Sequence, residues 1–99
     1  MTDNFKEIIK GETPVLVDFF ATWCGPCQVL GPILVDAKED LGDAVSVIKI
    51  DVDKNQELAD ALRIKGLPTL IIYKEGQMIW RQSGELDANT IIGIVQEQL

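Results

Sequence analysis

The chain has 99 residues, of which 46% are hydrophobic and 25% charged, with a formal net charge of -7 and no histidine. This length suits one domain, and we expect a single domain over residues 1–99. The acidic charge disfavours nucleic acid and anionic membrane surfaces as partners. The lack of histidine excludes histidine general bases, histidine metal ligands and Ser–His–Asp triads.

The N-terminus, Met-Thr-Asp-Asn, lacks the basic and apolar regions of a secretory signal. A mature chain cleaved from a precursor would look the same. No apolar stretch approaches the ~20 residues of a membrane span. We therefore expect a cytosolic protein that does not bind membranes, and we expect a monomer.

The first predicted element is a helix over residues 2–10, capped by Thr2 or Asp3. Its apolar face consists of Phe5, Ile8 and Ile9. Residues 15–20 are almost continuously apolar, which is typical of a strand buried on both faces. A long helix follows over residues 25–41, with a kink at Pro32. Its apolar residues at helical spacing are Val29, Leu30, Ile33, Leu34, Ala37 and Leu41.

The second half of the chain predicts three more strands and two more helices. They are a strand over residues 45–50, a helix over 55–63 closed by Gly66, strands over 69–73 and 78–82 joined through Glu75-Gly76, and a last helix that begins at Asp87 and buries Ile91, Ile92, Val95 and Leu99. The helix between the first two strands implies a right-handed parallel crossover, and the hairpin adds antiparallel strands. We therefore predict an α/β fold, with a mixed four-stranded sheet and helices on both faces.

Residues 51–55, Asp-Val-Asp-Lys-Asn, are similar to the opening of a calcium-binding loop. That loop needs glycine at its sixth position and glutamate at its twelfth, where this chain has Gln56 and Leu62. We therefore exclude calcium and expect these acids to cap the helix that follows.

Cys24 and Cys27 lie where the buried strand meets the long helix. Residues three apart at a helix start share a face, so their sulfurs can come within bonding distance. At the N-terminal edge, free N–H groups and the helix dipole lower the pKa of the Cys24 thiol. Cys27 lies a turn deeper, where we expect it to be more buried and less acidic. Cys24 is therefore the predicted nucleophile and Cys27 the resolving cysteine. Pro26 suits the first helical turn because a backbone N–H at that position would have no partner within the helix.

The segment Trp-Cys-Gly-Pro-Cys over residues 23–27 resembles the active site of thioredoxins. Residues 15–21 resemble the strand that leads to that site in the family. The tetrapeptide Gly-Leu-Pro-Thr over residues 66–69 is similar to the family's cis-proline segment, and Ser83-Gly84 to its late glycine. The resemblance implies the thioredoxin fold and thiol–disulfide exchange through a redox-active Cys24–Cys27 disulfide, with no metal and no other cofactor.

The chain departs from the family in three places. The usual first strand is absent, so the sheet should have four strands rather than five, with the strand over residues 45–50 at an edge. Phe20 stands where many thioredoxins have tryptophan, and Gln28 where lysine is common. The loss of that cation should modestly raise the pKa of the Cys24 thiol.

Asp18 is a carboxylate in the middle of an apolar strand, where burial should raise its pKa towards neutrality. In the family, the matching aspartate is thought to take the proton of the resolving cysteine through water. Lys49 matches a lysine that lies near that aspartate. The alternative is an Asp18–Lys49 pair that serves structure alone.

Pro68 comes just before a strand, and the Leu67–Pro68 bond resembles the family's cis bond, which packs against the disulfide and would exclude metals there. It leaves the Leu67 backbone free to pair with an extended substrate. The residues expected to form an apolar rim for substrate around Cys24 are Trp23, Gly25, Pro26, Leu67, Pro68 and Gly84. Trp80 could extend the rim, but we expect a partly exposed strand residue.

Pro26 offers the Cys24 thiolate no cation and no side-chain donor, which favours a reductant over an oxidant. The expected partners are a thioredoxin reductase and proteins with disulfides. Other readings stay open: an oxidant or isomerase, a binding module of the same fold, a zinc or iron–sulfur site shared by two chains, or a structural disulfide. A short disulfide loop constrains the unfolded chain little, and zinc takes four ligands where this chain has two cysteines.

Overall fold

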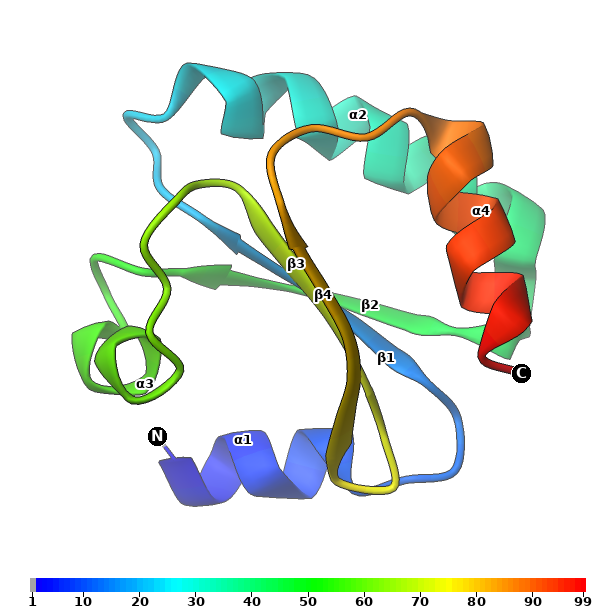
Figure 1. Ribbon diagram of the computed structural model, residues 1–99, viewed down its shortest axis with the longest axis horizontal. Helices are drawn as coiled ribbons and strands as arrows, with labels where there is room; N and C mark the ends of the chain where they lie inside the picture. The colour runs from blue at the N-terminus through cyan, green and yellow to red at the C-terminus, as the bar shows by residue number, and fades with distance from the viewer. Residues whose placement is uncertain (1) are drawn as a thin grey trace.

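The computed structural model describes residues 2–99, and it shows a sheet between two pairs of helices (Figure 1). The elements, in order, are α1 (Thr2–Ile9), β1 (Val15–Phe20), α2 (Gly25–Leu41), the 3-10 turn η1 (Gly42–Ala44), β2 (Ser46–Asp51), α3 (Gln56–Ala61), β3 (Thr69–Lys74), β4 (Gln77–Ser83) and α4 (Ala88–Glu97). This order of helices and strands confirms the prediction. The cap expected at Thr2 or Asp3 lies outside the described side chains.

The four strands lie in the order β2-β1-β3-β4. β1 pairs with β2 in parallel, with Asp18 beside Lys49, whereas β3 is antiparallel to both β1 and β4. The hairpin closes through Glu75 and Gly76, both at positive φ (53° and 81°), as a two-residue turn that matches the strand twist. The predicted mixed sheet, with the strand after α2 at an edge, is confirmed.

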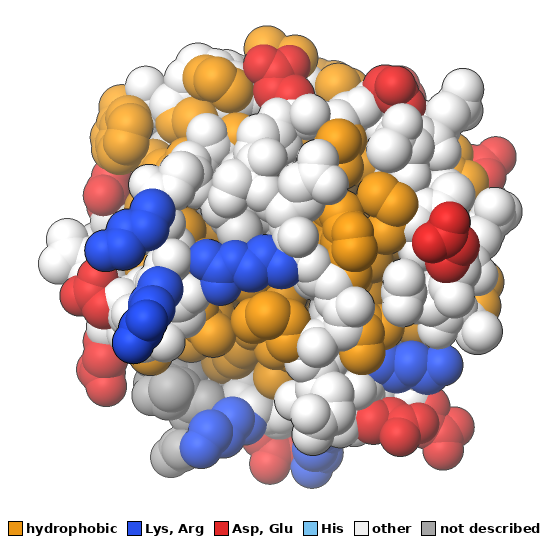
Figure 2. Space-filling model, in the orientation of Figure 1, with side chains coloured by type: hydrophobic (Ala, Val, Ile, Leu, Met, Phe, Trp, Pro, Cys, Tyr) orange, Lys and Arg blue, Asp and Glu red, His pale blue; other side chains and the backbone are white. Residues whose placement is uncertain are grey.

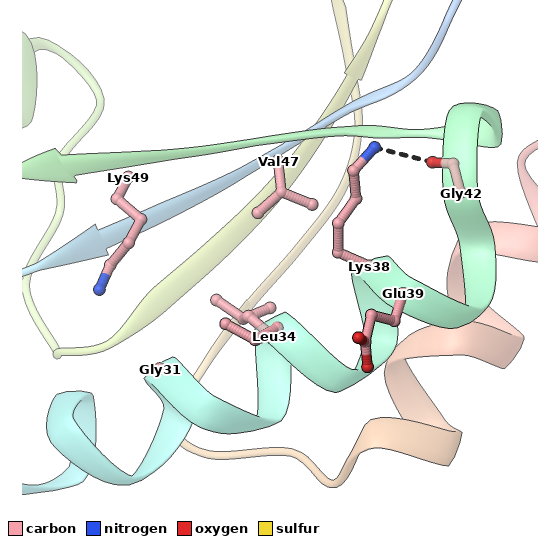
Figure 3. A pocket seen from close by; sticks show the side chains of 8 residues that line it. Gly31, Leu34, Lys38, Glu39, Gly42, Val47 and Lys49 are labelled. Atoms are coloured by element: carbon pink, nitrogen blue, oxygen red, sulfur yellow. Dashed lines mark hydrogen bonds between the residues drawn. The ribbon is translucent and has the colours of Figure 1, made fainter.

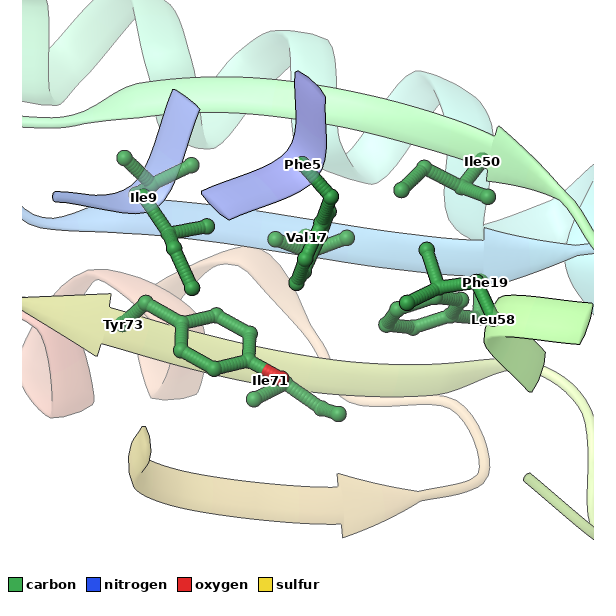
Figure 4. Close-up of a cluster of buried hydrophobic side chains, with 9 residues drawn as sticks. Phe5, Ile9, Val17, Phe19, Ile50, Leu58, Ile71 and Tyr73 are labelled. Carbon is green, nitrogen blue, oxygen red and sulfur yellow. The ribbon is translucent and has the colours of Figure 1, made fainter. Parts of the chain in front are cut away.

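Side chains of β1 alternate between two hydrophobic clusters, one on each face of the sheet. On one face, α1 and α3 cover Val17 and Phe19 (Figure 4). The edge of the Tyr73 ring packs against Phe5 there, with centroids 5.3 Å apart. On the other face, α2 and α4 cover Leu16 through Leu30, Leu34, Ala37, Ile91 and Val95. Helices on both faces therefore explain why β1 is apolar on both sides.

Three side chains that we expected to be buried are exposed. Ile8 is 41% exposed, Val29 52% and Leu99 60%. Ile8 lies one position off the stripe that Phe5 and Ile9 form at a spacing of four. Val29 is displaced in the same way from the buried stripe of α2, and Leu99 lies beyond the end of α4.

The predicted end of the third helix is also wrong. α3 ends at Ala61, and the chain reverses at Arg63, which has a φ of 54°. The Ile64 N–H then donates to the Ala59 carbonyl (2.9 Å), a Schellman closure, so Gly66 does not end this helix. At Pro32, α2 continues without interruption to its last turn, and the kink stays a prediction.

Candidate active site

Cys24 and Cys27 form a disulfide at the start of α2, with Cα atoms 5.3 Å apart. Cys24 is the N-cap of that helix, in extended backbone geometry, and Pro26 occupies its first turn. The Cys27 backbone N–H donates to Cys24 Sγ at 3.2 Å. In the reduced protein, this N–H and the positive end of the helix dipole favour the Cys24 thiolate over the thiol. The expected placement of the pair is confirmed.

The two cysteines differ less in burial than we expected. Cys24 is 5% exposed and Cys27 3%, and both pack with Ala21 in a small cluster. Phe20 and Leu67 cover this cluster. Position relative to the helix N-terminus, rather than burial, therefore distinguishes the two sulfurs.

The Leu67–Pro68 peptide bond is cis, as the resemblance implies. Pro68 is buried, and its carbonyl accepts the Gly84 N–H at 2.8 Å. Gly84 has a φ of 97°, a backbone conformation that residues with a Cβ rarely adopt. Of the predicted rim residues, Leu67 packs on the cysteine cluster, and the hydrogen bond between Gly84 and Pro68 connects two more.

The other predicted rim residues lie in the loop before α2 and in its first turn. Trp23 is 71% exposed, and Gly25 and Pro26 are exposed as well. A Cβ added at Gly25 would meet nothing within 4 Å, so the space over this turn is open. Trp80 lies elsewhere: it is half-buried and packs on the cluster beneath α2 and α4.

Asp53 is a contact residue that the sequence analysis missed. The Trp23 indole N–H donates to Asp53 Oδ2 at 2.8 Å, across 30 residues of sequence. Asp51 Oδ1 accepts the Asp53 N–H at 2.9 Å. The N-cap of α3 is Asn55, so the expected capping role of the two acids is wrong. The sequence signal for this contact was the acidic turn after β2, which we predicted to cap α3 rather than to accept a hydrogen bond from Trp23.

Asp18 is fully buried, and neither of its carboxyl oxygens has a hydrogen-bond partner in residues 2–99. Burial raises the pKa of this carboxyl to about 6, against an opposing effect of the Lys49 charge. Lys49 is exposed, and its ammonium lies over the Phe20 ring, 4.7 Å from the centroid. Lys49 therefore acts on Asp18 through its field, and the close ion pair that we considered does not form.

Within the described part of the chain, no group of three or more His, Cys, Asp and Glu side chains is placed to hold a metal ion. No helix of residues 2–99 is long and apolar enough to cross a membrane.

A disulfide at the N-terminus of a helix, on a mixed sheet and beside a cis-proline, defines a thiol–disulfide redox protein. The family model described as thioredoxin matches residues 1–97. The chain therefore belongs to the thioredoxin family.

Similar proteins come from plants and bacteria. A rice protein named chloroplastic thioredoxin Y is 47% identical over 97 residues, which are 97% of this chain and 58% of that protein. A thioredoxin-like protein of Synechocystis is 45% identical, with 94% of this chain and 90% of the relative covered. Bacillus subtilis thioredoxin is 35% identical, over 99% and 94% of the two chains. The chain thus spans less than two thirds of the rice protein and nearly all of the bacterial ones.

Among solved structures, chloroplastic thioredoxin z superposes with a TM-score of 0.88 at 40% identity, over 96% of this chain and 87% of that one. Mitochondrial thioredoxin 3 of Saccharomyces cerevisiae, in its oxidised form, gives 0.86 at 29% identity, over 97% and 89%. These likenesses confirm the thioredoxin fold.

Proposed function

We propose that this chain is a protein-disulfide reductase, with Cys24 as the nucleophile and Cys27 as the resolving cysteine. The observation that carries the proposal is the Cys27 N–H directed at Cys24 Sγ at the N-terminus of α2. This arrangement stabilises negative charge on Cys24, and the thiolate is the form that attacks a disulfide.

The reaction is an exchange of two electrons and two protons. The Cys24 thiolate attacks one sulfur of a target disulfide, forms a mixed disulfide and releases the first target thiolate, which takes up a proton. Cys27 then loses its proton and attacks Cys24 Sγ. The mixed disulfide breaks, the second target thiolate leaves and is protonated, and the Cys24–Cys27 disulfide forms. The target disulfide is reduced, and the dithiol of this chain is oxidised.

Asp18 is the proposed acceptor of the Cys27 proton, through water. Its support is a buried carboxyl without a protein partner, two residues before the Phe20 side chain that covers the cysteine cluster. A pKa of about 6 lets this carboxyl take and return a proton near neutral pH. Lys49 favours the ionised form of Asp18 and thereby keeps the base available.

Substrate is proposed to lie on the apolar rim around Cys24, as an extended segment along the Leu67 backbone. Its support is that Trp23, next to Cys24 in the chain, is exposed and that the half-buried Leu67 packs on the cysteine cluster. We further propose that residues 1–99 act as one thioredoxin domain and that a thioredoxin reductase restores the dithiol. The cytosolic location stays a prediction, since similar plant proteins are named chloroplastic.

The test of direction is the equilibrium reduction potential of the cysteine pair in a glutathione buffer. A potential well below that of the glutathione couple supports a reductant, and a potential at or above it supports an oxidant or isomerase instead.

The test of roles uses serine variants with insulin as the disulfide substrate. Cys24→Ser should abolish insulin reduction, whereas Cys27→Ser should accumulate a mixed disulfide through Cys24, which mass spectrometry detects. A partner that binds wild type and Cys24→Ser equally, without insulin reduction by either, would indicate a binding module.

A further inference from the structure

Two hydroxyl side chains lie next to the cis-proline segment, residues 66–69. Thr69 is the first residue of β3, and it pairs with Ser83, the last residue of β4. Thr69 is fully buried, and its Oγ1 lies 2.6 Å from the Gly66 carbonyl oxygen and 2.8 Å from Ser83 Oγ. A buried hydroxyl with two partners is held in one orientation, so this contact is a fixed part of the structure.

The chemistry of these groups sets the direction of both hydrogen bonds. A carbonyl oxygen only accepts, so the single hydroxyl proton of Thr69 goes to the Gly66 carbonyl. The Ser83 hydroxyl must then donate to Thr69 Oγ1. The result is a hydroxyl network that runs from Ser83 through Thr69 to Gly66, in which each bond polarises and strengthens the other.

The Leu67 backbone lies between two carbonyls that are held in this way. The hydroxyl network holds the Gly66 carbonyl, and the Gly84 N–H holds the Pro68 carbonyl at 2.8 Å. Within residues 2–99, no hydrogen bond uses the N–H or the carbonyl of Leu67 itself. The contacts from the end of β4 therefore fix both flanks of Leu67 and leave its own backbone groups available.

Leu67 also lies at the disulfide, because its side chain packs on the cluster of Cys24 and Cys27. The loop before β3 and the start of α2 are at the same end of the sheet (Figure 1). Figure 2 shows mostly uncharged atoms, in white, between the upper half of β4 and α2. Recognition of a peptide at this place would therefore depend on backbone hydrogen bonds rather than on charge.

We propose that Ser83 is a positioning residue for substrate. Acting through Thr69, it holds the Leu67 backbone in the conformation that pairs with an extended peptide. This inference rests on the proposed function, in which substrate lies along Leu67. A Thr–Ser pair across two strands supports strand pairing in any sheet. Here the network continues to a carbonyl of the cis-proline segment, and that second bond gives Ser83 an effect on binding.

Ser83→Ala removes the first donor of the network and leaves the proposed rim residues in place. We expect KM for insulin to rise about fivefold, the effect of one hydrogen bond between neutral groups, with kcat unchanged. The rate with a small aromatic disulfide and the reduction potential of the cysteine pair should stay at their wild-type values. Ser83→Thr keeps the hydroxyl and should restore KM. An unchanged KM in Ser83→Ala, or a shifted potential, would overturn the proposal.

The order of the network provides a second test. Thr69→Val keeps the shape of the side chain and removes both the acceptor for Ser83 and the donor to Gly66. In that background, Ser83→Ala should have no further effect on KM, because its partner is already absent. Two effects that simply add would contradict the proposal. Ser46→Ala, a change at the other serine of the chain, which is exposed at the start of β2, should leave KM at its wild-type value.

The molecule offers a second apolar surface to a peptide, a groove of about 580 Å³ between α2 and β2 (Figure 3). None of the residues that line it belongs to the cysteine cluster. Val35 lines this groove and is 62% exposed, so Val35→Ser should leave KM for insulin unchanged. A larger rise of KM in Val35→Ser than in Ser83→Ala would place substrate in the groove and overturn the proposal.

The Leu67 amide reports on the network without any substrate. In ¹⁵N relaxation of the oxidised protein, Ser83→Ala should lower the order parameter of Leu67 and leave those of α2 unchanged, and Ser83→Thr should restore it. If wild type does not reduce insulin, the proposed function is wrong. Equal Leu67 order parameters in wild type and Ser83→Ala would contradict the present inference whether or not insulin is reduced.

Discussion

Trp23 exposes 71% of its surface, yet one hydrogen bond to Asp53 fixes its indole. A carboxylate acceptor makes this bond stronger than one between neutral groups. The bond connects the loop before α2 with the turn after β2, so it orients the largest apolar side chain of the proposed rim. Orientation of an exposed indole reduces the entropy that a bound substrate would otherwise lose.

Asp53→Ala removes the acceptor and should free the indole of Trp23. We expect KM for insulin to rise about threefold, since an exposed hydrogen bond contributes of the order of 1 kcal/mol. The rate with a small aromatic disulfide should stay the same, because that substrate reaches Cys24 without the rim. Asp53→Asn keeps an acceptor oxygen and should restore most of the affinity. An Asp53→Ala protein with unchanged KM would show that the bond does not serve substrate binding.

Asp18→Asn preserves the shape of the carboxyl and removes its capacity to take a proton. In wild type, the attack of Cys27 on the mixed disulfide should speed up as the pH rises through about 6, because the ionised Asp18 carboxyl is the base. In Asp18→Asn this inflection should be absent, and the step should be about tenfold to a hundredfold slower at pH 7. Stopped-flow decay of a mixed disulfide on Cys24 measures the rate. Asp43→Asn, a change at an exposed acid in η1, is the control and should retain the wild-type profile.

Arg81 connects two elements, because its guanidinium on β4 donates to the carbonyls of Leu62 (2.7 Å) and Arg63 (2.9 Å) at the end of α3. Carbonyl groups at a helix C-terminus lack partners within the helix and carry the negative end of its dipole. α3 has six residues, too few for a stable isolated helix, so contacts of this kind must hold it on the sheet.

Arg81→Gln should lower the free energy of unfolding by about 1 kcal/mol, as expected for two exposed charge-assisted hydrogen bonds. Amide hydrogen exchange should accelerate in α3 more than in α2. Lys65→Gln removes a positive charge from the same region without a hydrogen bond of this kind, and it should leave both measurements unchanged. Equal destabilisation by the two variants would assign the effect to net charge rather than to the contact.

For the whole molecule, the hydrophobic periodicity predicted the helices and the strands. The consecutive apolar residues of β1 also predicted that helices cover both faces of the sheet, because such a strand is buried on both sides. Local pattern could not separate Ile8 from Ile9, since which of two neighbours meets Phe5 and Tyr73 depends on how α1 is docked. The residue at positive φ that follows α3 is Arg63 rather than a glycine. Its N–H and that of Ile64 donate to carbonyls of the helix, and its own carbonyl accepts from Arg81, a contact that local sequence does not show.

Position at the helix start and a spacing of three predicted that the two sulfurs can come within bonding distance, because such residues share one face. The redox-active disulfide itself was implied by the resemblance to thioredoxins. The bond between Trp23 and Asp53 was not predictable, because only the parallel pairing of β1 with β2 brings their two loops together.

Asp18 also sets a pH dependence for the stability of the whole molecule. Its pKa rises from 3.8 to about 6 on folding, so between these values the native state binds more protons than the unfolded state. Stability should therefore fall as the pH rises from about 4 to about 6 and remain lower above that. Asp18→Asn removes this dependence and should raise the free energy of unfolding at pH 7, by an amount of the order of 3 kcal/mol. The gain should disappear below pH 4, where Asp18 is protonated in both states.

Asp87 provides a control of opposite sign. It caps α4 through the Thr90 N–H (2.7 Å), and that bond lowers the pKa of its carboxyl. Its contribution to the free energy of unfolding is present above pH 3.8 and is lost as the pH falls through the lowered pKa of Asp87. Asn can also cap, so Asp87→Asn should be slightly less stable than wild type at pH 7 and equal to it in acid. Urea unfolding of the oxidised proteins from pH 3 to 8 separates the two residues. If Asp18→Asn and wild type keep a constant difference across that range, Asp18 does not have a raised pKa.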